Sequence, residues 1–192
     1  MSPTDDVDRS VSTLPEGLWT QPQPSGADLG DAEAVQRVRM PAAMVYDYSP
    51  GLARTRFLRG LQEKKILGER CPETGDVYVP PTGVAPVSGL LTTEQVEVGP
   101  YATITPFCVV HIGFGVNAPP TPFVSALFLP DGAAVSLYGT VGEISHDEVR
   151  IGMRVEPVWV DDDQLTTSME NIRYWRPIDE PDVPAEQLKG HM

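Results

Sequence analysis

Two short motifs near the middle of the 192-residue chain constrain its fold more than any other feature. Cys71-Pro72-Glu73-Thr74-Gly75 and Ala85-Pro86-Val87-Ser88-Gly89, with Pro80-Pro81 between them, have the layout of two zinc-ribbon knuckles, each closed by glycine. Such a ribbon carries thiolates at positions equivalent to 71, 74, 85 and 88. Thr74, Ala85 and Ser88 cannot supply the soft anionic ligands that a closed tetrahedral zinc site needs. We therefore predict a ribbon over residues 66–95 that has lost its metal site.

Length and cysteine content indicate a small intracellular protein. The chain is long enough for one domain with an ordinary apolar core. It has two cysteines and no secretory signal, which favours a reducing cytoplasm and argues against a disulfide framework. No apolar run approaches the roughly 20 residues of a membrane-spanning helix, so no membrane association is expected.

The formal charge of −13 is distributed unevenly along the chain. Residues 1–33 hold seven acids and one base, and residues 161–192 hold eight acids and three bases. Residues 34–160 are nearly neutral, with twelve acids and ten bases, six of which fall within 54–70. This basic segment is either a solvated helix face or a site for a phosphate-bearing ligand or an acidic partner.

Proline, glycine and polar residues predict a disordered acidic arm over residues 1–35. Residues 36–65 are expected to hold an extended segment followed by a helix over about 51–64, which Ser49-Pro50 would start. The apolar stripe of this helix is narrow, so it could face either the core or a partner. Its members are Leu52, Phe57, Leu58 and Leu61.

The remainder of the chain is mainly β. Two short strands are expected at 66–70 and 77–79, and longer ones at about 101–112, 122–129, 134–141 and 154–160. A capping-box pattern predicts a short helical turn over 146–150. This arrangement is typical of a five-stranded OB-fold barrel, which we place at 96–163, followed by an acidic tail over 164–192.

The first long barrel strand is apolar on both faces. Phe107, Val109 and His111 alternate with Cys108 and Val110, and residues 123–129 show the same two-sided pattern. A small barrel in water would carry polar groups outside, so one outer face is expected to be covered. Cys108 is predicted to be a core residue, on the face opposite to His111, which excludes a catalytic pair between them.

An ordered series of motifs resembles a known family. The series begins at Phe57-Leu58-Arg59-Gly60-Leu61 and Arg70-Cys71-Pro72, continues through Phe107-Cys108-Val109-Val110, and ends at Gly152-Met153-Arg154-Val155. It is similar to the acyl-CoA-associated family in which a rubredoxin-like zinc ribbon precedes an OB-fold. The resemblance covers roughly residues 50–162, and Glu170 to Pro177 resembles a tail found in part of that family.

The resemblance implies a non-catalytic accessory subunit of a thiolase, lipid-transfer aldolase, acyltransferase or hydratase of fatty-acid, sterol or polyketide metabolism. It does not extend to zinc, and we expect neither a cofactor nor catalytic residues in this chain. The surface expected to bind the partner enzyme comprises helical and barrel residues: Phe57, Leu58, Leu61, Phe107, His111 and Phe123. Contacts to the phosphates of acyl-CoA are assigned to Arg54, Arg59, Lys64 and Lys65.

Two other functions stay open. A stand-alone acyl-CoA-binding module would use the basic helix for the nucleotide and the apolar face for the acyl chain. An OB-fold that binds single-stranded nucleic acid needs a positive groove with stacking aromatics. Residues 96–160 contain only Arg150 and Arg154 as bases, against six acids, which disfavours that function. The run Asp161-Asp162-Asp163 is interpreted as a solvated acidic turn.

Overall fold

The computed structural model describes residues 46–113 and 119–191. The chain divides into two units, Met1–Tyr48 and Ser49–Met192, and every helix and strand given below belongs to the second. The predicted disordered arm, and most of the extended segment expected after it, lie outside the described residues.

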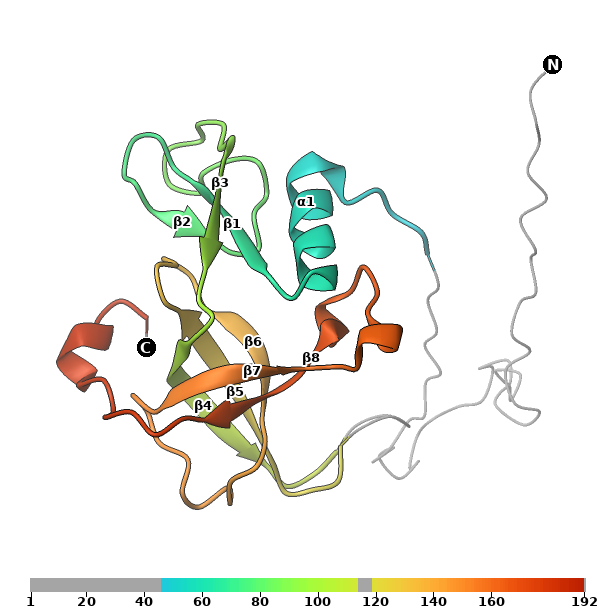
Figure 1. Cartoon of the computed structure of the whole chain (residues 1–192). Helices are drawn as coiled ribbons and strands as arrows, with labels where there is room; N and C mark the ends of the chain where they lie inside the picture. Colours follow the sequence, from blue (N-terminus) through green and yellow to red (C-terminus); the bar gives the residue numbers. More distant parts are fainter. Residues whose placement is uncertain (1–45, 114–118, 192) are drawn as a thin grey trace, which may run out of the picture. The chain divides into compact units, whose positions relative to one another are not determined.

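The one α-helix among the described residues, α1 (Gly51–Gln62), packs beside the first strand of the ribbon (Figure 1). Its buried residues are Ala53, Phe57, Gly60 and Leu61, so Phe57 and Leu61 of the apolar stripe face the core of their own chain, whereas Leu52 is exposed. The helix ends two residues earlier than predicted, because Lys64 adopts a left-handed conformation (φ 58°). Hydrogen bonds from the N–H groups of Lys64 and Lys65 to the last turn close a Schellman-type C-terminus.

The ribbon is a three-stranded antiparallel sheet in the order β2-β1-β3. Its strands are β1 (Ile66–Arg70), β2 (Val77–Tyr78) and β3 (Glu94–Val98). The first knuckle connects β1 to β2, and the second lies between β2 and β3. The structure therefore has a small sheet at the position of the predicted ribbon, and it includes β3, which we did not predict as a separate strand.

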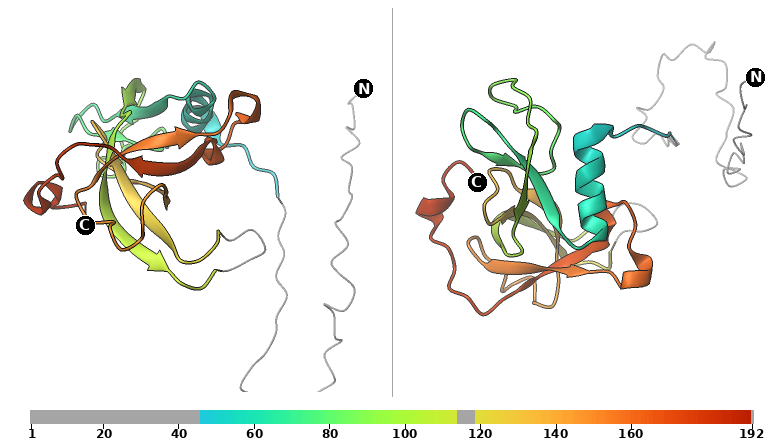
Figure 2. Two further views of the ribbon diagram at one scale, coloured as in Figure 1. Left: turned by 60° about the horizontal axis from the view of Figure 1, so that its bottom comes forward. Right: turned by 45° about the horizontal axis from the view of Figure 1, so that its top comes forward.

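The barrel is closed, in the strand order β4-β5-β6-β8-β7 (Figures 1 and 2). Its strands are β4 (Ala102–Val110), β5 (Phe123–Pro130), β6 (Leu137–Val141), β7 (Arg154–Trp159) and β8 (Ile172–Pro177). The mainly β fold, with a helix and ribbon before an OB-type barrel, is as predicted. The predicted helical turn at 146–150 is only a hydrogen-bonded turn, in which the Glu148 N–H donates to the Ser145 carbonyl.

The end of the barrel was predicted too early. We placed residues 164–192 in an acidic tail, but β8 lies in this segment and closes the barrel between β6 and β7. Trp175 of β8 is 1% exposed and stacks on Phe128 with a centroid separation of 4.9 Å. Burial of this large aromatic pair explains why the segment joins the barrel despite its acidic neighbours.

A β-bulge in β4 determines which side chains face outward. Between Ile104 and Phe107, β4 advances by three residues while β5 advances by two. The extra residue reverses the alternation beyond this point, so Phe107 and Val109 pack against the core. Cys108 is exposed as a result, and the prediction that it is a core residue is wrong.

Helix, ribbon and barrel share one hydrophobic core. Phe57 and Leu61 belong to the same buried cluster as Ile66 of the ribbon and Phe128 and Trp175 of the barrel. A second, smaller cluster lies between the knuckles and contains Cys71, Tyr78 and Ala85.

Candidate functional site

The two knuckles keep matching backbone geometry. In the first, the Gly75 N–H donates to the Cys71 carbonyl at 3.0 Å, and in the second the Gly89 N–H donates to the Ala85 carbonyl at 2.9 Å. Gly75 and Gly89 both have positive φ, 80° and 71°, which glycine adopts without a steric penalty. The second knuckle is held further by an antiparallel bridge between Val84 and Leu91. Backbone bonding therefore maintains the knuckle shape.

Of the four positions at which we expected a ribbon to carry ligands, three (Cys71, Ala85 and Ser88) lie close together between the knuckles. The Cys71 Sγ lies 3.7 Å from the Ser88 Oγ, and Ala85 packs with Cys71 and the ring of Tyr78. One thiol, two hydroxyls and a methyl group do not form the donor set of structural zinc. Among the described residues, no group of three or more His, Cys, Asp or Glu side chains could hold a metal ion. Between the knuckles, Cys71 and Ala85 are instead buried in one small cluster with Tyr78.

The Cys71 thiol lies in an environment that favours its anion. Hydrogen bonds from the side chain and backbone of Thr74, with smaller contributions from Glu73 and Ser88, lower the pKa of Cys71 from 9.0 to about 7. Burial opposes this change but is outweighed. Because the side chain is only 1% exposed, the ionisation of this thiol acts on the stability of the ribbon.

Apolar side chains project from the second knuckle into solvent. We call this set the knuckle tip: Val84 (40% exposed), Val87 (81%), Leu90 (45%) and Leu91 (71%). We did not predict this exposed apolar set from the sequence, because we considered the segment only for metal ligands. The available signal was four large aliphatic residues within eight positions of a loop.

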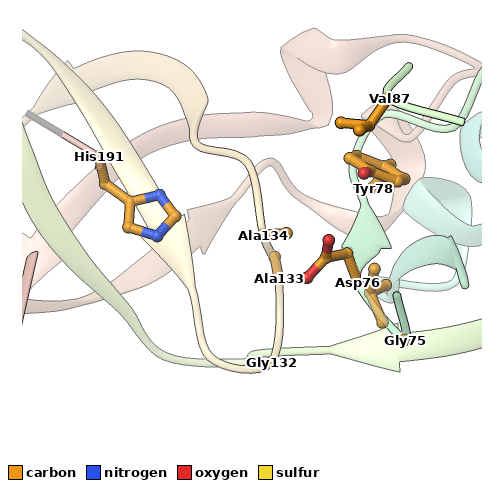
Figure 3. Close-up of a pocket in the computed structure, with 9 residues that line it drawn as sticks. Gly75, Asp76, Tyr78, Val87, Gly132, Ala133, Ala134 and His191 are labelled. Atoms are coloured by element: carbon orange, nitrogen blue, oxygen red, sulfur yellow. The ribbon is translucent and has the colours of Figure 1, made fainter. Parts of the chain in front are cut away.

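Three hollows lie in series from the knuckles to the outer face of the barrel. The first, of about 590 Å³, lies between the first knuckle, Val87 and the β5–β6 loop (Figure 3). The second, of about 430 Å³, shares Ala134 and His191 with the first, and Pro106 and Leu127 with the third. Adjacent hollows therefore share wall residues along this side of the molecule.

The third hollow, of about 290 Å³, lies on the outer face of β4, β5 and β6. No charged side chain lines it, and its wall includes Leu127 and Tyr138, which is 69% exposed. Phe107 and Cys108 lie on opposite sides of the β4 backbone, and both border this hollow. The described barrel therefore presents an apolar depression on its outer surface, as the two-sided strand pattern suggested.

The predicted partner-binding residues do not share one surface. Phe57 and Leu61 are fully buried, which contradicts their prediction as docking residues. Leu58 and Phe107 are partly buried against the core. Phe123 follows the outward alternation of β5, and His111 is exposed just beyond β4, with its ring 6.3 Å from that of His146.

The four cations predicted to contact phosphate fall into two groups: two form ion pairs with carboxylates and two do not. Lys64 pairs with Asp162 and Lys65 with Glu63. Within the described residues, Arg54 and Arg59 of α1 have no carboxylate within 4.0 Å. None of these four cations lines any of the three hollows. The structure does not bring the basic helix and these hollows together.

The two bases that the sequence placed in the barrel, Arg150 and Arg154, form ion pairs, and β8 adds Arg176, which pairs with Glu156, and Arg173, whose guanidinium lies 4.0 Å from Asp161. Arg150 binds Asp182 in a bidentate arrangement, and Arg154 binds Asp131 and Glu180. These partners raise the pKa of each guanidinium above its ordinary value. Nucleic-acid phosphates would have to displace these carboxylates. Separately, the described chain contains no helix with the length and apolar character needed to cross a membrane.

Comparisons with known proteins identify the fold. No protein family matches the chain by sequence, and no curated protein is similar to it. A solved structure described as the Ltp2-ChsH2(DUF35) aldolase superposes with a TM-score of 0.50 at 21% identity, covering 66% of this chain and 95% of that chain. A DUF35-family protein of unknown function from Sulfolobus solfataricus gives 0.47 at 18% identity, covering 64% and 81%. The first likeness supports the predicted mainly β, OB-type architecture.

Proposed function

We propose that this protein is a non-catalytic accessory subunit that binds and stabilises a thiolase-like acyl-CoA enzyme of lipid, sterol or polyketide metabolism. The candidate partners are a thiolase, a lipid-transfer-type aldolase or an acyltransferase in the cytoplasm. The name of the first similar structure, which pairs a DUF35 component with Ltp2 in an aldolase, favours this choice. The motif series given above, from the helix to Val155, favours the same family.

The observation that carries the proposal is the apolar depression on the outer face of β4, β5 and β6. A rigid sheet supports it, and Tyr138 exposes most of its ring at the border. Exposed apolar surface on a well-packed element is typical of a protein-binding site, and aromatic side chains often dominate the binding energy there. A partner covering this face would bury about 800 Å² per subunit in an interface of ordinary size.

Co-expression with a thiolase-like enzyme encoded in a neighbouring gene tests the proposal. We expect the two proteins to co-elute in gel filtration, and the enzyme to be more soluble or more active with acyl-CoA in the complex. Tyr138→Lys should weaken binding at least about tenfold without unfolding the chain, because the ring is exposed. Leu52→Lys on the exposed side of α1 is the matched control. Separate elution, with an enzyme equally active alone, would overturn the proposal.

A further inference from the structure

The knuckle tip lies within a long stretch of sequence that lacks positive charge. From Cys71 to Val149 the chain contains eight acids and no lysine or arginine. The knuckle tip and the strands β4, β5 and β6 all belong to this stretch. The exposed cations of α1 lie before it, and Arg150 after it is paired with Asp182.

Carboxylates border the tip. Asp76 lines the same hollow as Val87, and Glu73, three residues earlier in the first knuckle, is exposed. Glu94 begins β3 three residues after Leu91, and its carboxylate is 3.1 Å from the Arg70 guanidinium. Arg70 also donates to the Gly75 carbonyl, so this neighbouring cation is already engaged. Among the described residues, Glu73 and Asp76 have no cation within 4.0 Å.

The tip is also rigid. Ala85 and Leu90 are joined by a backbone hydrogen bond of 2.8 Å, and Thr92 and Gly83 by one of 3.0 Å. Buried Cys71 and Ala85 support the loop from below. Because these bonds already hold the backbone of the loop, the knuckle tip would lose little further backbone entropy on binding a partner.

We propose that the knuckle tip is a docking knob that inserts into the partner enzyme. The complementary site on the enzyme is an apolar hollow bordered by lysine and arginine side chains. The inference rests on the proposed accessory function and adds the chemistry of the partner surface. Aliphatic side chains supply the contact at the centre. The acidic border supplies charge complementarity, which accelerates association and excludes acidic surfaces.

The test uses the complex of the full chain with the thiolase-like enzyme of the co-expression experiment. Val87→Lys and Leu91→Lys each remove apolar contact and place a cation against the expected basic border. We expect each to raise the dissociation constant at least about tenfold, with circular dichroism and thermal midpoint unchanged. Leu52→Lys, at a residue of similar exposure on α1 (66%), should change it less than about twofold.

The second part of the test measures how charge reversal and salt concentration change the rate of association. Glu73→Lys should slow association several-fold at about 0.1 M salt. The difference from wild type should largely disappear at about 1 M, where the screening length falls from about 10 Å to about 3 Å.

The outcomes separate the two proposals. If Tyr138→Lys weakens the complex and neither knuckle variant does, the knob is refuted and the accessory function stands. If Leu52→Lys weakens binding as much as Val87→Lys, the knob is likewise refuted. If the isolated chain self-associates and Val87→Lys makes it monomeric, the tip binds a second copy and the proposed occupant is wrong. If wild type forms no complex, both proposals fail.

Discussion

At the scale of single residues, Cys71 affects the stability of the fold through its surroundings in the knuckles. Its neighbours there are Ser88, Ala85 and Tyr78. Its lowered pKa makes the stability of the fold depend on pH. A thiol that ionises more readily in the folded state than in the unfolded state stabilises the folded state when it is ionised. The contribution is fully present above the unfolded pKa near 9.0 and is lost as the pH falls through about 7.

We therefore expect the free energy of unfolding to rise between pH 7 and pH 9 through Cys71. Urea titrations at intervals across this range should show the rise in the wild-type chain. Cys71→Ala should remove this component of the pH dependence. Cys108→Ala should retain it, since Cys108 is exposed on the barrel. Parallel curves for wild type and Cys71→Ala would contradict the assignment.

At the scale of elements, α1 is part of the core, and the two knuckles are held by contacts within the chain. Phe57 and Leu61 place the helix against both the ribbon and the barrel. The knuckles are closed by backbone hydrogen bonds and by the small Cys71 cluster. Each element thus depends on packing with its neighbours in the same chain.

Phe57→Ala should destabilise the fold by about 3–5 kcal/mol, because it leaves a cavity beneath the helix. The measurement is chemical denaturation of the isolated protein, without any partner. Leu52→Ala, at an exposed position of the same helix, should change stability by less than about 0.5 kcal/mol. A folded Phe57→Ala protein of wild-type stability that only loses its partner would restore the original docking interpretation.

The ribbon should bind no stoichiometric zinc. Metal analysis of protein purified without chelators should give far less than one zinc per chain, since one thiol cannot form a closed site. Added chelator should leave the thermal midpoint unchanged. About one tightly held zinc per chain would require ligands elsewhere, such as His111 or His146, and would overturn this expectation.

At the scale of the whole molecule, charge is segregated along the sequence. The exposed cations of α1 precede a stretch of 79 residues, from Cys71 to Val149, with no lysine or arginine. Of the arginines that follow it in the barrel, Arg150, Arg154 and Arg176 are paired with carboxylates, and Arg173 of β8, which is half exposed, lies 4.0 Å from Asp161. The barrel surface therefore offers little attraction to polyanions.

Single-stranded DNA and RNA should bind weakly or not at all at physiological salt, because few phosphate contacts and little counterion release are available. Fluorescence anisotropy with labelled oligonucleotides of mixed sequence provides the measurement. A basic OB-fold protein serves as the positive control. Submicromolar affinity with a steep salt dependence would make nucleic-acid binding the leading function.

Local patterns predicted the elements better than their positions in the fold. The helix, the knuckles and the strands β4 to β7 follow from caps, turns and alternation of apolar residues. The bulge after Ile104 has no comparable local signal, and it reversed the expected burial of Cys108. β8 was missed because its pairing depends on β6 and β7, which are distant in sequence.

The candidate site was predicted only in part. The knuckle frame and the unusual apolarity of the barrel face could be recognised from spacing and alternation. The burial of Phe57 and Leu61 could not, because a narrow apolar stripe fits either the core or a partner. The knuckle tip and the ion pairing of Arg150 and Arg154 depend on contacts across the fold.

Closure of the barrel by β8 has a consequence for the synthesis of the chain. β8 is the last strand made, yet it lies between β6 and β7. Its first residue follows the end of β6 by 31 positions, from Val141 to Ile172, which takes about 2–6 s at ordinary translation rates. Until then the nascent barrel has two unpaired strand edges and lacks Trp175 against Phe128. The growing chain is therefore most open to pairing with other nascent chains during these seconds.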